Sequence, residues 1–108
     1  MGNVVQFRPD PRKEAAPTLR QLVEKVRELA QDSENIGFLN PHVQERMLLR
    51  GKTMREILEV LSKGEGVKGP DLGEFGDYRI KLRRYVCGKR TQVVVAVRER
   101  DLSVITVF

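Results

Sequence analysis

Apolar residues recur at helical spacing in the segment "TLRQLVEKVRELA", residues 18–30. Its leucines and valines fall three and four positions apart, so they share one face of a helix. Thr18 and Gln21 form a capping box that fixes the start of this helix. The pattern predicts that Leu22, Val26 and Leu29 pack either on the chain's own sheet or on a second copy of the chain.

Two shorter helices are predicted over residues 41–50 and 54–63. The stretch "NPHVQERMLLRG" begins with asparagine and proline, which suit the N-cap and the first helical position, and Gly51 suits the residue after the end. The second helix follows a capping box formed by Thr53 and Glu56. Because only a short connection separates the two helices, we expect a helical hairpin.

The period of the pattern changes to two after a glycine-rich stretch. The segment "GEGVKGPDLGEFGD" predicts a loop, with room for an edge strand around Val67. "YRIKLRRY" then alternates apolar and basic side chains, while "TQVVVAVR" and "LSVITVF" are apolar on both faces. These segments predict three consecutive antiparallel strands near 77–87, 91–98 and 102–108, and "IGFL" predicts a small strand before the second helix.

Together the elements predict an α+β fold, with N-terminal helices packed on a small antiparallel sheet. We expect a mobile tail over residues 1–16, an accessory helix over 17–31 and an α+β domain over 36–108. No apolar run approaches the roughly 18 residues that a membrane helix needs. The first residues also lack the apolar core of a signal peptide. We therefore expect a cytoplasmic protein without a membrane partner.

Basic residues gather in the last third of the chain. Residues 1–75 hold 12 Lys/Arg and 12 Asp/Glu, whereas residues 76–108 hold 8 and 3. Such a local positive field favours a polyanion as partner, RNA first and an acidic protein second, although it also suits a surface that only keeps the protein soluble. The lone Cys87 has no second cysteine to form a disulfide or a zinc site with, so no metal or cofactor is expected.

The candidate chemistry lies on the helix 41–50 and on the strand that starts at Tyr78. Metal-independent RNA cleavage needs a group that takes a proton from the 2′-hydroxyl, cations for the phosphate and a proton donor for the leaving oxygen. Histidine titrates near neutral pH and suits the first task. The side chains proposed for this chemistry are His42, Arg46, Lys81, Arg83 and Tyr85. The cations proposed to hold nucleic acid around them are Arg50, Arg79, Arg84, Lys89 and Arg90.

Each candidate also has a purely structural explanation. His42 can cap its own helix or bond Glu45, and Arg46 and Arg50 can pair with glutamates of the next helix. The basic strand face can serve as solvated charge that blocks pairing at an outer strand. Tyr85 can simply pack. The sequence leaves these alternatives open.

The order of these elements resembles a known family. "HVQERMLLRG" supplies a histidine, an arginine four residues later and Arg-Gly, while "VVVAV" and "SVITV" supply closing apolar strands. Over residues 36–108 this pattern is similar to a bacterial family, the domain of unknown function 4258, which looks distantly like the RelE-type toxins. The resemblance implies a RelE-like fold with His42, Arg46 and Arg50 on the signature helix and Thr106 in the closing strand.

Three functions follow as expectations, and one of them is that of a relative which has kept the fold and lost catalysis. The resemblance implies a toxin-like RNA-binding protein or a metal-independent endoribonuclease of a bacterial toxin–antitoxin system, with a small acidic antitoxin-like protein as partner. The alternative is a non-catalytic interaction module that docks an acidic protein segment and uses its first helix to form a homodimer. Because the sequence shows no adjacent catalytic pair, it does not separate these functions.

Overall fold

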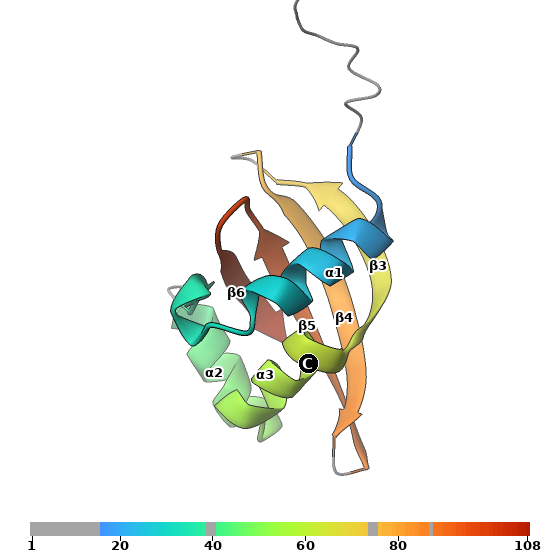
Figure 1. Ribbon diagram of the computed structural model, residues 1–108. Coiled ribbons are helices and arrows are strands. Elements are labelled where there is room, and N and C mark those ends of the chain that lie inside the picture. Colours follow the sequence, from blue (N-terminus) through green and yellow to red (C-terminus); the bar gives the residue numbers. More distant parts are fainter. Residues whose placement is uncertain (1–15, 39–40, 74–75, 87) are drawn as a thin grey trace, which may run out of the picture.

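The chain folds into the α+β arrangement that its pattern predicts (Figure 1). The computed structural model describes residues 16–38, 41–73, 76–86 and 88–108. The predicted N-cap Asn40, the lone Cys87 and residues 1–15 of the predicted tail lie outside the described residues.

The strands at the end of the chain pair in sequence order, as the period-two pattern predicts. β4 (Tyr78–Val86), β5 (Lys89–Val97) and β6 (Leu102–Val107) form an antiparallel meander. β3 (Glu65–Leu72) pairs antiparallel with β4, and the short β2 (Ile36–Gly37) pairs parallel with β6. The order across the sheet is therefore β2-β6-β5-β4-β3.

β3 confirms the edge strand that the sequence allowed around Val67, and it covers much of the segment that was predicted to be a loop. Its glycines and Pro70 concealed an eight-residue strand because both residue types are depleted in strands. With β3 in place, β4 is paired on both sides, so its charges do not protect an outer strand. The edge of β3 is itself unsuited to further pairing, since it carries Lys68, Pro70 and two shifts of register.

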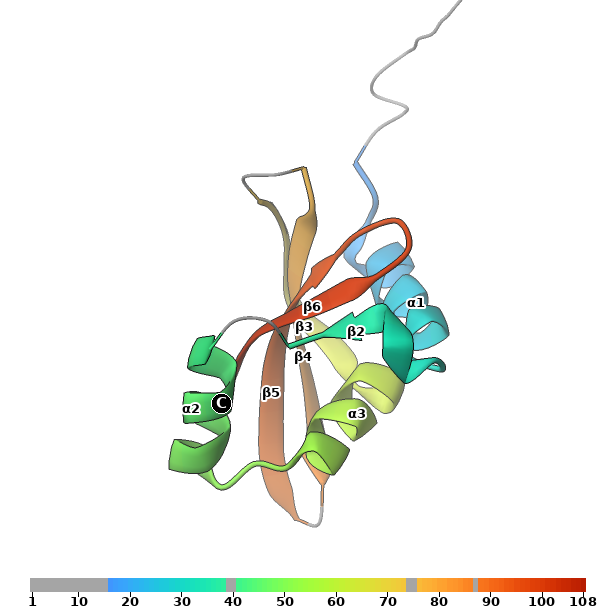
Figure 2. The same ribbon diagram turned by 90° about the vertical axis from the view of Figure 1, so that its left-hand side faces the viewer.

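The helices lie on different sides of the sheet (Figure 2). α1 (Leu19–Leu29) and α3 (Met54–Lys63) pack on one face, whereas α2 (Pro41–Arg50) lies on the other side, against β6. The expected helical hairpin is therefore wrong. Gly51, with φ of 63°, ends α2, and the chain then passes to the opposite side of the sheet, where α3 buries its apolar stripe.

The accessory helix α1 packs on the chain's own sheet. Leu22 and Val26 are buried there, against β3 and α3, and Leu29 is partly buried. Gly66 permits this close approach, because a Cβ atom at that position would lie 2.8 Å from Cγ2 of Val23. The apolar stripe is thus covered within one chain, and a homodimer through this helix stays a prediction.

Local capping explains where the helices begin. The Thr18 hydroxyl accepts a hydrogen bond from the Gln21 amide at 3.1 Å, and the Thr53 hydroxyl accepts one from the Glu56 amide at 3.2 Å. Both predicted capping boxes are confirmed. In the ranges that the structure covers, no helix is long and apolar enough to cross a membrane.

Candidate functional site

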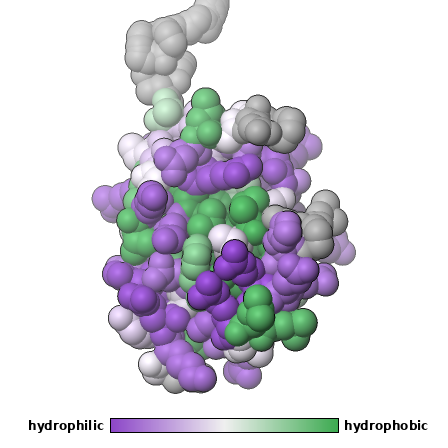
Figure 3. Space-filling view, turned by 180° about the vertical axis from the view of Figure 1, so that it is seen from behind, coloured by the Kyte–Doolittle hydropathy of each residue, from purple (hydrophilic) through white to green (hydrophobic). Residues whose placement is uncertain are grey.

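The outer face of the sheet, defined as the face turned away from α1 and α3, carries the predicted basic side chains of β4. Ile80 and Leu82 are buried in the core, so the alternating positions Arg79, Lys81 and Arg83 lie on the outer face. Figure 3 shows this side of the molecule, where hydrophobic surface at the centre is surrounded by polar side chains. The alternation read from the sequence therefore placed these three cations on one face.

A groove crosses the outer face above β3, β4 and β5. A pocket of about 240 Å³ is lined by Lys68, Arg79, Lys81, Val94 and Phe108, among others. A second pocket, of about 460 Å³, shares Asp71, Arg79 and Val94 with the first and extends it along β3. The groove thus has an apolar floor, and its walls carry three cations together with the acidic residue Asp71.

Phe108 lies where two elements converge. Its backbone continues β6 by pairing with Gln92, whose carbonyl accepts a hydrogen bond from the Phe108 amide at 2.8 Å. The Nζ atom of Lys81 lies 4.8 Å from the ring centroid, and the Cζ atom of Arg50 lies 5.5 Å from it. Both distances suit cation–π interactions. The Phe108 ring thus brings together Arg50 of α2 and Lys81 of β4, whereas the sequence prediction placed His42 and Arg46 beside this strand.

Two of the cations on the outer face form ion pairs with nearby carboxylates. The Nη2 atom of Arg83 donates to Oε1 of Glu65 at 2.7 Å, and this hydrogen bond raises the pKa of Arg83 above its usual value. The Nε atom of Arg79 lies 3.5 Å from Oδ2 of the buried Asp77. These pairs fix the two guanidinium groups and reduce their attraction for an external anion.

Three other cations near the groove are not paired in this way with any carboxylate that the structure describes. Within the described part of the chain, Lys68, Lys81 and Arg50 have no carboxylate in ion-pair contact. Lys68 and Lys81 are also cross-strand partners, an arrangement in which like charges repel. An anion in the groove would relieve this repulsion.

His42 does not reach the groove. It is exposed at the start of α2, and its Nδ1 atom lies 3.5 Å from Oε1 of Glu45, as its structural explanation anticipates. Eight residues separate it from Arg50, or about 12 Å along the helix axis. Arg46 is exposed between the two. Neither His42 nor Arg46 lines either pocket of the groove.

The remaining predicted residues lie around the far end of β4. Arg84 belongs to the inner face, because its Nε atom donates to Oε2 of Glu59 on α3 at 3.1 Å. Tyr85 is exposed on the outer face opposite Arg90, and Lys89 is exposed beside Arg90 in the hairpin. The hairpin therefore extends the basic surface, whereas Arg84 stabilises the packing of α3.

Sequence reasoning missed Phe108 and Lys68 as site residues. Lys68 was hidden because the sequence allowed an edge strand around Val67 without fixing its register or the face on which each side chain lies. The face on which Phe108 lies depends on a shift of register between β5 and β6 at Val94 and Val95, which no local pattern reveals. The sequence held one signal for Phe108: an aromatic residue comes directly after an apolar strand, in the same predicted sheet as a basic strand.

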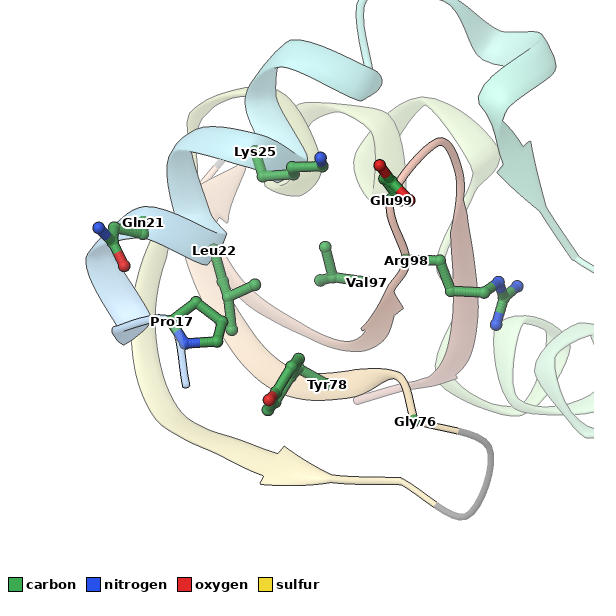
Figure 4. A pocket seen from close by; sticks show the side chains of 9 residues that line it. All are labelled: Pro17, Gln21, Leu22, Lys25, Gly76, Tyr78, Val97, Arg98 and Glu99. Atoms are coloured by element: carbon green, nitrogen blue, oxygen red, sulfur yellow. The ribbon is translucent and has the colours of Figure 1, made fainter. Parts of the chain in front are cut away.

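A separate pocket of about 440 Å³ opens on the other side of the molecule, between α1 and the start of β4 (Figure 4). Leu22, Val97 and the ring of Tyr78 form its walls, and Lys25 and Glu99 lie at its rim. No set of three or more His, Cys, Asp or Glu residues suited to a metal ion occurs among the residues described. This pocket is mainly apolar and gathers no set of groups suited to acid–base chemistry.

A family model described as "Domain of unknown function (DUF4258)" matches residues 39–108, and the chain belongs to this family. A search of curated proteins and a search of solved structures each gave no match. The matched region contains Arg50, Lys68, Lys81 and Phe108, so the whole outer-face site lies within it. α1 precedes that region although it completes the core.

Proposed function

We propose that this member of the family binds single-stranded RNA on the outer face of its sheet. One observation carries the proposal: Phe108 is exposed, at 37% for the whole residue, and Lys81 and Arg50 converge on its ring. Sites for single-stranded nucleic acid combine cations that hold phosphates with aromatic rings on which bases stack. The outer face provides both features within a few ångströms.

The groove favours a flexible strand over a duplex. Its ring can stack only on a base that is unstacked from its neighbours, and such bases occur in single strands and loops. Lys68 and Lys81 in the groove wall are free to contact successive phosphates, since they have no carboxylate partner among the described residues. The resemblance to RelE-type toxins supports RNA as the nucleic acid and a toxin-like role in a bacterium.

The proposal is for binding rather than cleavage. A general base has to lie within hydrogen-bond reach of the proton that it removes. His42 lies at the end of α2 away from Arg50 and Phe108, so it is poorly placed for a phosphate held in the groove. We therefore assign the outer face to RNA recognition and assign no proton-transfer role to His42.

The test measures binding of a labelled oligouridine by fluorescence anisotropy across a series of salt concentrations. Lys81→Ala and Arg50→Ala should weaken binding, and each should reduce the salt slope by about 0.7, the contribution of one phosphate contact in a single strand. Arg20→Ala is the control for net charge, because it removes from the inner side an exposed cation of α1, whose Nε atom lies 3.9 Å from Oε2 of Glu24. The proposal fails if wild type does not bind, or if Arg20→Ala weakens binding as much as Lys81→Ala does.

A further inference from the structure

α2 exposes two adjacent leucines that the fold does not use. Leu48 is 85% exposed and Leu49 is 80% exposed, while Val43 is buried and Met47 partly buried on the side of the helix that packs against the protein. Figure 3 shows a hydrophobic patch over the helix, at the lower right. Helix formation does not require leucine at these positions, since lysine or glutamate would serve as well and keep the surface polar. A contiguous apolar patch at the surface marks an interaction site.

The leucines lie within a strongly basic segment. Residues 46–55 contain four Lys/Arg and no Asp/Glu. The nearest preceding acid is Glu45, whose Oε1 atom lies 3.5 Å from Nδ1 of His42. Lys52 is fixed to the sheet, because its Nζ atom donates to the carbonyl of Arg90 at 3.1 Å. An apolar patch beside cations complements a segment that has leucine-like side chains and carboxylates.

We propose that the Leu48–Leu49 surface of α2 docks an acidic amphipathic segment of another protein. The apolar side chains of that segment cover the two leucines, and its carboxylates face Arg46 and the basic residues that follow α2. Grooves and helix faces recognise amphipathic segments in this way, with apolar anchors for affinity and charges for selectivity. The proposal is independent of RNA binding, since leucine side chains offer nothing to a phosphate backbone.

Two other occupants fit this surface less well, a second copy of the chain because of its charge and a membrane because of the small apolar area. A second copy of the chain would bring its own four cations of residues 46–55 against these four, and like charges across an interface oppose association. A membrane surface would receive only two leucine side chains from α2. Even a complete myristoyl chain gives only marginal binding to a bilayer, so two leucines would hold the protein there weakly.

The probe is a synthetic amphipathic helical peptide with leucines along one face and glutamates along the other. Two matched peptides replace its glutamates with lysines or its leucines with serines. Binding to wild type is compared with binding to Leu48→Ser/Leu49→Ser and to the control Leu72→Ser, which alters a leucine that is 69% exposed on β3. We expect the acidic peptide to bind wild type and Leu72→Ser, and the double variant to lose about tenfold or more in affinity.

Several results would overturn the proposal. One is that the acidic peptide fails to bind wild type, and another is that it binds the double variant as tightly as wild type. The third such result is that the lysine peptide binds wild type as tightly as the acidic peptide does. It is also overturned if the double variant dissociates a dimer seen in sedimentation, or abolishes binding to vesicles rich in anionic lipid. Thermal unfolding checks that the double variant folds, and Arg46→Glu tests the charge requirement without any loss of apolar surface. Oligouridine binding by the double variant should equal that of wild type, so the two proposals fail independently.

Discussion

The Nζ atom of Lys81 lies 4.8 Å from the centroid of the Phe108 ring, although β5 separates the strands on which the two residues lie. Neighbouring strands are about 4.8 Å apart, so the side chains of Lys81 and Phe108 together bridge roughly 10 Å of sheet. The contact places an aromatic ring beside the ammonium group of Lys81, which has no carboxylate partner among the described residues, on the outer face. The predictions about RNA follow from this arrangement.

Replacing Phe108 by leucine should weaken oligouridine binding while Phe108→Tyr should preserve it. Leucine keeps apolar contact but removes the flat ring, and stacking of a base on an aromatic side chain is worth about 1 to 3 kcal/mol. The expected loss of affinity is thus roughly five- to 150-fold. The measurement is anisotropy at one fixed salt concentration. Equal affinities for Phe108→Leu and wild type would show that no base stacks on the ring.

Glu65→Gln should tighten RNA binding. The substitution removes the carboxylate that pairs with Arg83 at 2.7 Å, so this guanidinium becomes free to contact a phosphate. The pKa of Arg83 is raised by that hydrogen bond, and the group carries its charge in either variant throughout the neutral range, so the gain should not depend on pH. The readout is a steeper salt dependence than that of wild type.

Glu28→Gln is the control for Glu65→Gln, because it removes an equal charge from an exposed position on α1. Both variants should unfold at nearly the wild-type temperature, since exposed ion pairs contribute little to stability. If the two variants tighten RNA binding equally, the effect comes from net charge and the pairing of Glu65 with Arg83 is irrelevant to the ligand.

His42→Ala should change oligouridine affinity by no more than a few fold. The side chain is exposed and lies beside Glu45, away from Phe108 and the groove. We also expect no metal-independent cleavage that depends on this residue, because it cannot reach a phosphate bound beside Lys81. Gel analysis of labelled RNA incubated with chelator checks this. Cleavage by wild type that disappears in His42→Ala would restore the catalytic role that the sequence suggested.

Val26→Ala should lower the free energy of unfolding by about 2 kcal/mol, because it removes two carbon atoms from a fully buried position and leaves a cavity. Glu28→Ala on the exposed side of the same helix should have little effect.

Deletion of residues 1–31 should reduce thermal stability further than Val26→Ala does. Unchanged melting of the truncated protein would show that α1 is an appendage and that the matched family region is stable alone.

Local patterns predicted the helices and the meander closely. α1 begins one residue after Thr18 and α3 one residue after Thr53, because capping boxes are decided by side chains three positions apart. The alternation in β4 likewise separated Ile80 and Leu82 from the basic outer residues, since successive side chains of a strand point to opposite faces. The same rule would have placed Arg84 on the inner face, where it pairs with Glu59.

The sequence by itself determined where most elements begin and end, because capping and periodicity act between residues a few positions apart. The sequence allowed an edge strand around Val67, but only the tertiary structure decided that the strand runs over Glu65–Leu72, since its residue types disfavour strands and its partner β4 supplies the hydrogen bonds. It also decided that α2 lies across the sheet from α3 and that Arg50, rather than His42, meets Lys81 at Phe108. These relationships depend on strand order, on a shift of register between β5 and β6, and on which face each helix covers. Such features arise from burial shared among distant segments, so no short window of sequence contains them.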